Sequence, residues 1–307
     1  MKHKLISAKV IADSVCPKGV RMTTMEIEYP RFILAELNTH RMLSKNSASS
    51  RAIPVKSMHE FIRANPATPV SWGKNQPGMK ANEEVGSSVA AEAEQLWNRA
   101  KDDALHWADA LAHKLGIHKQ IANRITEPWM TMKTVISGTE WTNFFHLRNH
   151  PDAQPEIKAL AEAMTVAYTT HLPVPLKPGD WHLPYITIAE YVPTGELQYF
   201  DENFNQLSLE DAKIISASCC AQVSYRKNDP GFTKAFKIWE QLIENDPVHA
   251  SPIEHQATPM DIDSMCRFEP DTWQPGVSHV SANSDLWSGN LRGWIQHRKL
   301  IQNEAVW

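Results

Sequence analysis

The sequence predicts an α+β fold in which long helices cover a twisted sheet. Residues 20–37 first alternate apolar and polar side chains, which is typical of a strand, and Pro30 separates this part from an apolar continuation expected to be helical. Residues 82–115 instead place apolar side chains three and four positions apart, as an amphipathic helix does. A sheet with helices on its surface accommodates both patterns.

The other elements follow in chain order. Residues 52–65 predict a short helix, residues 66–81 a loop rich in Pro and Gly, and Gly116 ends the long helix. Two further helical regions are predicted at residues 118–148, with a break or a new start at Pro128, and at residues 154–169.

The second half begins with a segment rich in proline. Residues 172–205 predict short strands and loops and form the best candidate for a connector. Ser208 is a plausible N-cap for the next helix, and another helix is expected at residues 232–244. We interpret residues 1–307 as a single catalytic domain in which residues 172–205 join residues 1–171 to residues 206–307.

Composition excludes several classes of protein. The net charge of -4 argues against a surface for nucleic-acid polymers, and no run of about 18 apolar residues predicts a membrane span. The start lacks the pattern of a signal peptide, so we expect a cytoplasmic protein of a bacterium or of a phage-infected host. The cysteines lack the C-x-x-C spacing of a zinc site, and we predict no metal.

Two short stretches of the chain match each other. THRMLSKNSASSR at residues 39–51 places His40-Arg41 before Asn46, and QHRKLIQNE at residues 296–304 places His297-Arg298 before Asn303. The first stretch gathers side chains that bind phosphate oxygens, namely Arg41, Ser44, Asn46, Ser49 and Arg51. It predicts an anion site for a nucleotide or a dinucleotide.

The first stretch resembles the signature R-H-R-x-x-S-x-N-E-x-S-x-R of flavin-dependent thymidylate synthases. The departures are Thr39 for the first Arg and Ser47 for the Glu. NFFHLRNHPDAQPEI at residues 143–157 is similar to the family's late block, and Arg124 matches an Arg upstream of it. CAQVSY at residues 220–225 and HASPIEH at residues 249–255 are similar to its opening blocks.

The order of these blocks differs from that of the family, because the opening blocks follow the closing one. We therefore predict a circular permutation with a second, partial copy of the signature. Glu304 in that copy supplies the Glu that the first copy lacks. Our hypothesis is that the first copy binds the nucleotide phosphate and the second mainly supports flavin binding.

The resemblance implies an antiparallel sheet and a flavin-dependent transfer of one carbon from methylenetetrahydrofolate to C5 of a deoxypyrimidine monophosphate, with dUMP converted to dTMP. FAD and NADPH would be the other cofactors, and no cysteine nucleophile would be needed. It also implies a homo-oligomer, either a dimer or a tetramer. No thiol in the sequence has the basic neighbours of an activated nucleophile, which agrees with this chemistry.

The resemblance also implies roles for individual residues. Arg148, Arg51 and Ser49 would be catalytic, and substrate contacts would come from these three with Arg124 and Ser47. Cofactor contacts would come from His40, Arg41, Ser44, Asn46, Asn143, Ser224, His249, Ser251, Glu254, His297, Arg298, Asn303 and Glu304.

Alternative functions follow from the departures from the family pattern, among them Asp152 for a His and Ser137 for an Asn. A relative could methylate dCMP, or form a hydroxymethyl pyrimidine as in phage-type base modification. A non-catalytic homologue that binds nucleotide or flavin is another class. A methylase that depends on Cys219 or Cys220 is disfavoured.

Overall fold

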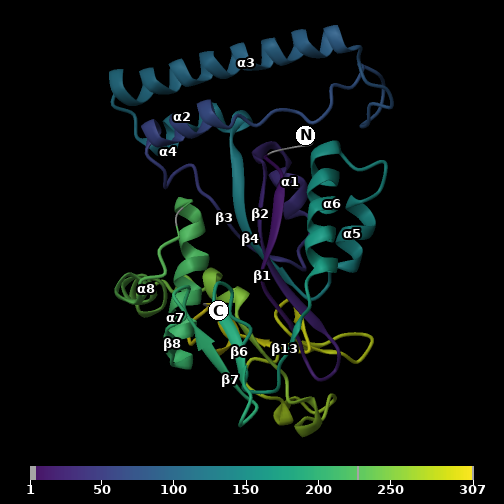
Figure 1. Cartoon of the computed structure of the whole chain (residues 1–307), viewed down its shortest axis with the longest axis vertical. Coiled ribbons are helices and arrows are strands. Elements are labelled where there is room, and N and C mark those ends of the chain that lie inside the picture. Colours follow the sequence, from purple (N-terminus) through teal and green to yellow (C-terminus); the bar gives the residue numbers. More distant parts are fainter. Residues whose placement is uncertain (1–4, 227, 306–307) are drawn as a thin grey trace.

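The centre of the computed structural model, which describes residues 5–226 and 228–305, is a five-stranded sheet of order β3-β4-β2-β1-β5. The strands are β1 (Ser7–Val15), β2 (Arg21–Pro30), β3 (Ser44–Ser47), β4 (Thr131–Gly138) and β5 (Val174–Pro175). All neighbours pair antiparallel except β1 and β5. The predicted α+β fold with a mainly antiparallel sheet is confirmed (Figure 1).

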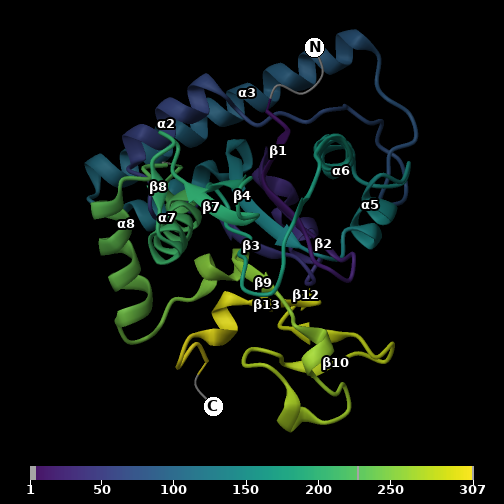
Figure 2. The ribbon, with the colours of Figure 1, turned by 60° about the horizontal axis from the view of Figure 1, so that its bottom comes forward.

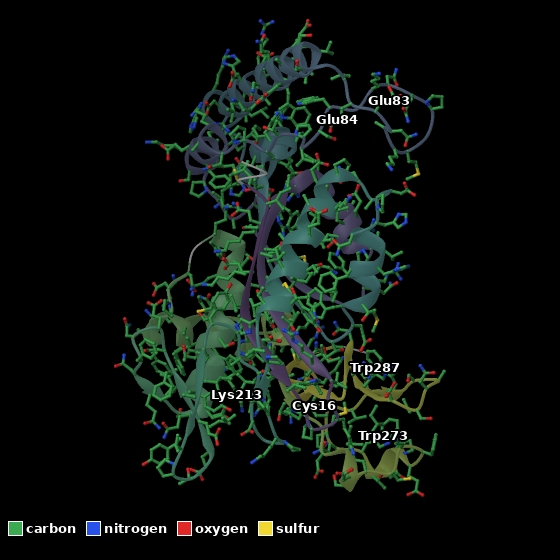
Figure 3. All side chains as sticks on the ribbon, turned by 45° about the vertical axis from the view of Figure 1, so that its right-hand side comes forward. Cys16, Glu83, Glu84, Lys213, Trp273 and Trp287 are labelled. Carbon is green, nitrogen blue, oxygen red and sulfur yellow. The ribbon has the colours of Figure 1, made fainter. Side chains whose placement is uncertain are left out.

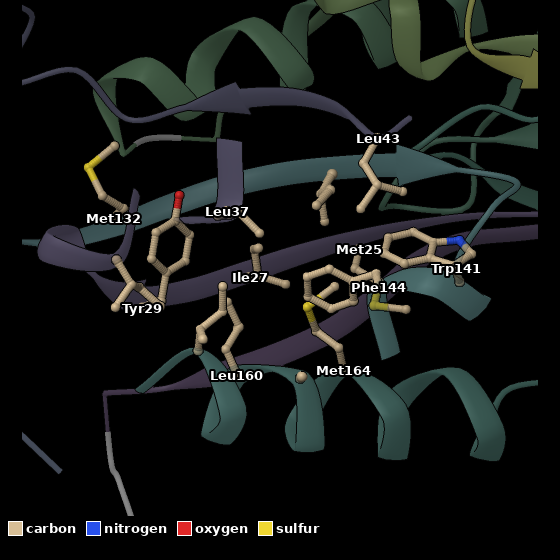
Figure 4. Close-up of a cluster of buried hydrophobic side chains, with 14 residues drawn as sticks. Met25, Ile27, Tyr29, Leu37, Leu43, Met132, Trp141, Phe144, Leu160 and Met164 are labelled. Atoms are coloured by element: carbon tan, nitrogen blue, oxygen red, sulfur yellow. The ribbon is translucent and has the colours of Figure 1, made fainter. Parts of the chain in front are cut away.

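One face of this sheet carries the largest apolar core. Helices α5 (Thr142–Arg148) and α6 (Pro155–Thr170) pack on it, and α6 begins where Gln154 accepts a hydrogen bond from the Ile157 amide. Fully burying side chains of this size stabilises the fold by about 1.5–3 kcal/mol each. Figure 4 shows the cluster, which includes Met25, Ile27, Tyr29, Leu43, Met132, Trp141, Phe144, Leu160 and Met164.

Helix α7 (Leu209–Gln222) supports the sheet through a second cluster. Cys220 and Val223 pack on Val135 of β4, together with Ile11 of β1. Ser208 caps this helix by accepting a hydrogen bond from the Asp211 amide, as predicted. Helix α8 (Phe232–Trp239) and the π-turn η5 (Glu240–Glu244) follow, which confirms the helix expected at residues 232–244.

The predicted connector does contain short strands. β6 (Thr187–Tyr191), β7 (Glu196–Phe200) and β8 (Gln206–Leu207) form a separate antiparallel sheet. The 3-10 helix η6 (Ser251–His255) leads into β9 (Ala257–Pro259), which pairs with β13 (Trp294–Gln296), and η9 (His297–Leu300) follows.

Between β9 and β13 lies a small segment at the lower edge of Figure 2. It contains η7 (Ile262–Ser264), η8 (Pro270–Thr272), β10 (His279–Val280), β11 (Leu286–Ser288) and β12 (Leu291–Arg292). Trp273 belongs to an apolar cluster within this segment, while Glu83 and Glu84 lie in a loop at the opposite end of the molecule (Figure 3).

The helical prediction for residues 118–148 was wrong in its middle part. This region contains α4 (Lys119–Ala122), the 3-10 helix η3 (Asn123–Trp129), strand β4, and only then α5. Thr134, Val135 and Ile136 are β-branched, and in β4 they are buried between two paired strands. The second half of residues 20–37 does become helical, in η1 (Arg31–Ile33) and α1 (Leu34–Asn38).

The helix α2 (Val55–Ala64) and the long helix α3 (Ser87–Asp109) confirm two predictions, and the π-turn η2 (Ala110–Lys114) extends α3. The predicted apolar face of α3 nevertheless points largely to solvent: Val89, Leu96 and Trp107 are 52%, 56% and 59% exposed. Of the predicted face, Ala104 is buried, and the helix packs through it and through Leu105 beside it. None of the helices among the described residues is long and apolar enough to cross a bilayer.

Candidate active site

Two clefts lie next to each other where β3 meets η6. Cleft 1, of about 1020 Å³, is lined by Ser47 and Arg51 on one side and by Ser251 and Pro252 of η6 on another. Cleft 2, of about 520 Å³, is lined by residues that include Ser44 of β3 and Glu254 of η6. The edge strand and one turn of 3-10 helix therefore contribute to both clefts.

Cleft 1 is suited to an anion with an apolar body. Three cations line it, Lys45, Arg51 and Lys234, and no carboxylate does so among the residues that the structure describes. Hydroxyl and amide groups alternate with the apolar side chains of Ile53, Ile238 and Leu242. Such a mixture of a few polar groups on an apolar wall is typical of small-ligand sites.

Cleft 2 brings the two copies of the signature together. Arg41 comes from the first copy and Arg298 from the second, and Lys45 and Lys299 add further positive charge. Arg298 forms ion pairs with Glu254 and with Glu304, the latter at 2.6 Å. The donor set of cleft 2 fits a pyrophosphate group, since several cationic N–H donors converge there.

The predicted site residues are divided between these clefts. Asn46, Ser47, Arg51, Ser224, His249 and Ser251 line cleft 1, whereas Arg41, Ser44, Glu254 and Arg298 line cleft 2. The Ser49 amide donates to the Ser224 carbonyl at 3.0 Å, which ties the first copy to the CAQVSY block. The structure thus gathers segments that are far apart in the sequence.

Arg148 and His40 form a pair outside the residues that line the clefts. Arg148 Nε donates to His40 Nε2 at 2.8 Å, and Phe144 packs edge-on against the imidazole. Burial, followed by the positive charges of Arg148 and Lys45, lowers the pKa of His40 to about 4. A neutral imidazole is the form that can accept this hydrogen bond.

The remaining predicted residues also lie elsewhere. Arg124 pairs with Glu127 at 2.9 Å, and Asn143 is exposed at the start of α5. His297 is buried against Trp181 and Trp239, with Nδ1 2.6 Å from Gln256 Oε1, and a core role fits this position. Asn303 and Glu304 follow η9, and Glu304 pairs with Arg298 and Lys299, which line cleft 2.

Sequence reasoning missed several residues that line the clefts, chiefly Lys45, Lys234, Gln241 and Asn290. Lys45 occupies an unspecified position of the family signature, and the other three lie outside every recognised block. The amphipathic pattern of α8 was the available signal for Lys234, because it places Lys234 and Ile238 one turn apart on one face.

The thiols of Cys219 and Cys220 are unsuited to nucleophilic attack. Burial raises the pKa of Cys219 to about 12 and raises that of Cys220 well above its ordinary value. A thiol needs a lowered pKa, an adjacent base or a metal to act as a nucleophile near neutral pH. Both cysteines instead pack in apolar clusters of α7.

A buried hydrogen-bond chain holds η6 in place. Ser137 Oγ lies 2.8 Å from His255 Nδ1 and 2.6 Å from Thr24 Oγ1. Thr24 Oγ1 in turn lies 2.8 Å from His182 Nε2, and His182 Nδ1 lies 2.9 Å from Ser14 Oγ. This chain fixes His255, the last residue of η6, against the central sheet.

The fold and the clefts together define an α+β protein with two adjacent cationic clefts, whose lining suits anionic ligands. The sequence model of the thymidylate synthase complementing protein family matches residues 20–174, about half of the chain. The chain belongs to this family, the flavin-dependent thymidylate synthases. The match ends before the CAQVSY and HASPIEH blocks, so the circular permutation stays a prediction.

Solved structures of two similar proteins can be compared. The UMP/dUMP methylase PolB from Streptomyces cacaoi, bound with 5-Br UMP, is 17% identical over 55% of this chain and 90% of its own, with a TM-score of 0.46. Thymidylate synthase X from Helicobacter pylori, with FAD and dUMP, is 19% identical over 48% of this chain and 67% of its own, with a TM-score of 0.34. No curated protein sequence matches the chain.

Proposed function

We propose that the protein transfers a one-carbon unit from methylenetetrahydrofolate to C5 of dUMP, with FAD and NADPH as its other cofactors and the whole chain acting as one catalytic domain. Its membership of the family supports this reaction. The observation that carries the proposal is the pair of adjacent cationic clefts, one without a carboxylate among its described lining residues and the other built from both signature copies.

The nucleotide is assigned to cleft 1. Arg51 presents a guanidinium fork for the phosphate, and Ser47 and Ser224 present hydroxyl groups for the sugar or the base. The apolar wall of Ile53, Pro54 and Pro252 would exclude water from one side of the pyrimidine. His249 and Ser251 lie in the same cleft, where a folate would enter.

The flavin is assigned to cleft 2. Arg41 and Arg298 would hold its phosphates, and Glu254 keeps Arg298 oriented through their ion pair. When bound, the flavin supplies the hydride that reduces the transferred carbon. The contribution of the chain is to hold the two ligands side by side across β3 and η6.

The test is to load the protein with FAD and incubate it with methylenetetrahydrofolate, NADPH and dUMP, followed by mass spectrometry of the nucleotide. We expect a nucleotide heavier by one CH2, because a methyl group replaces the hydrogen at C5, and no product when NADPH or the folate is omitted. Parallel samples with dCMP establish the acceptor. Unchanged dUMP in a protein with bound FAD would contradict the proposal.

A homo-oligomer is also proposed, through the exposed face of α3. Val89, Ala93, Leu96, Ala100 and Trp107 are separated by four, three, four and seven residues, which places them on one seam. Four of these residues are symmetric about residue 98, so an antiparallel second copy would set Val89 opposite the partner's Trp107 and Leu96 opposite the partner's Ala100, while Ala93 would face the partner's Asp103. A two-fold interface requires such self-complementarity.

Leu96→Asp is expected to dissociate this oligomer, because it places a charge in the apolar seam. Sedimentation equilibrium of the FAD-loaded protein measures the change in mass. Gln95→Asp is the matched control, since it adds the same charge one position away on the exposed surface of the same helix. An unchanged mass for Leu96→Asp would remove α3 as the interface.

A further inference from the structure

Lys45 lines both clefts, and no other described residue is shared between their linings. It lies on β3, where Ser44 lines only cleft 2 and Asn46 and Ser47 line only cleft 1. The side chain of Lys45 therefore stands at the junction of the two spaces. This junction is where a ligand of cleft 1 would meet a ligand of cleft 2.

The position of the Lys45 ammonium is fixed by the turn that precedes β3. Lys45 Nζ donates to the His40 carbonyl at 2.6 Å and to the Leu43 carbonyl at 2.9 Å. An ammonium has three N–H donors. Two of them hold the group in place within the described structure, and the third is available to a ligand.

The charge of Lys45 is not matched by a carboxylate ion pair among residues 5–226 and 228–305. Lys299 and Lys234, which each line one cleft, pair with Glu304 at 2.5 Å and with Asp229 at 3.2 Å. Glu254, the carboxylate that acts on Lys45 over a longer distance, pairs directly with Arg298. Burial lowers the pKa of Lys45 to about 8, so the group is mainly cationic at pH 7.

We propose that Lys45 is a ligand-binding cation shared by the two clefts, which contacts the nucleotide and the flavin where they meet. The inference rests on the proposed function, which places an anionic ligand in each cleft. It adds a residue that the family signature leaves unspecified, because Lys45 occupies the x between Ser44 and Asn46. A cation there favours negative charge on either ligand.

The test is a set of lysine-to-methionine substitutions, in which Met keeps an unbranched apolar side chain and removes the charge. The dissociation constant of FAD is measured by flavin fluorescence, and that of dUMP by calorimetry on the FAD-loaded protein. Lys45→Met is expected to weaken both by about tenfold or more, the usual effect of losing a charge-assisted hydrogen bond. Lys234→Met should weaken only dUMP, and Lys299→Met only FAD.

Two further variants separate binding from folding. Lys45→Arg keeps the cation and is expected to retain both affinities within about threefold, a change of under 1 kcal/mol. Lys213→Met is the matched control, because Lys213 is a buried lysine of α7 that lines neither cleft. Its ammonium lies 4.1 Å from the ring centre of Trp181, and Figure 3 shows its position. It should leave both affinities unchanged.

The outcomes distinguish this inference from the proposed function. If the unaltered protein binds neither FAD nor dUMP, the proposed function fails, and the role of Lys45 fails with it. If it binds both and Lys45→Met changes only one affinity or neither, the shared role of Lys45 is wrong while the proposed function stands. Loss of both affinities in Lys213→Met would show that the effect is a general loss of structure, and would overturn the inference.

Discussion

Two buried histidines, His182 and His255, are together expected to lower the free energy of unfolding by about 4 kcal/mol between pH 7 and pH 5. Burial lowers the pKa of each to about 3 from an ordinary value of 6.5, and for His182 the charge of His255 adds to this effect. As the pH falls below 6.5, the unfolded chain takes up protons that the folded chain cannot. The stabilisation is therefore complete above that value and is lost progressively between pH 6.5 and 3.

Urea denaturation monitored by tryptophan fluorescence at pH 5, 6, 7 and 8 measures this loss. His255→Asn should reduce the loss of unfolding free energy between pH 7 and 5 by about 2 kcal/mol, because Asn keeps a hydrogen-bonding group near Ser137 without titrating. At pH 8 both histidines are neutral in either state, so the difference between the two proteins there reports packing alone. An unaltered slope in His255→Asn would contradict the assignment.

Arg51→Met is expected to reduce kcat/KM for dUMP by about 10- to 100-fold, which corresponds to a loss of roughly 1.5–3 kcal/mol. Arg51 lines cleft 1 and has no ion pair in the described part of the chain, so its guanidinium is available to a phosphate. Most of the change should appear in KM, because the phosphate is distant from the reacting carbon. FAD affinity should be retained, since Arg51 does not line cleft 2.

Steady-state kinetics with FAD-saturated protein tests this expectation. Arg51→Lys should fall between the original protein and Arg51→Met, because an ammonium keeps the charge but loses the bidentate fork. Arg267→Met, on an exposed loop that lines neither cleft, is the control for removing an arginine. A normal KM in Arg51→Met would place the phosphate elsewhere.

The sequence was sufficient for those elements whose pattern is local. The cap at Ser208, the long helix α3 and the strand before Pro30 all carry their signals within a few residues. Strand β4 was missed because it is buried and paired on both sides, so its residues do not alternate in polarity. The exposure of the apolar seam of α3 was missed for a related reason. The spacing of apolar residues predicts that one face of a helix is apolar, but it does not predict whether this face packs on the rest of the chain or lies in solvent.

The candidate site was predicted in part for comparable reasons. The signature identified Arg41, Arg51 and Arg298, which the structure places in two adjacent clefts. The spacing of residues along the chain could not assign these arginines to two different clefts. The two clefts lie where η6 contacts β3, and these elements are far apart in the sequence. Lys45 could not be recognised from a motif that leaves its position open.

Cleft 2 depends on segments that a ribosome produces at very different times. Ser44 of β3 hydrogen-bonds Asn290, 246 residues later, which at about 5–20 residues per second corresponds to roughly 12–50 s of translation. During that interval β3 is an edge strand without the η6 segment that packs against it, and exposed strand edges invite pairing with other chains. The edge of β3 is therefore open to such pairing until η6, which begins at Ser251, has been synthesised.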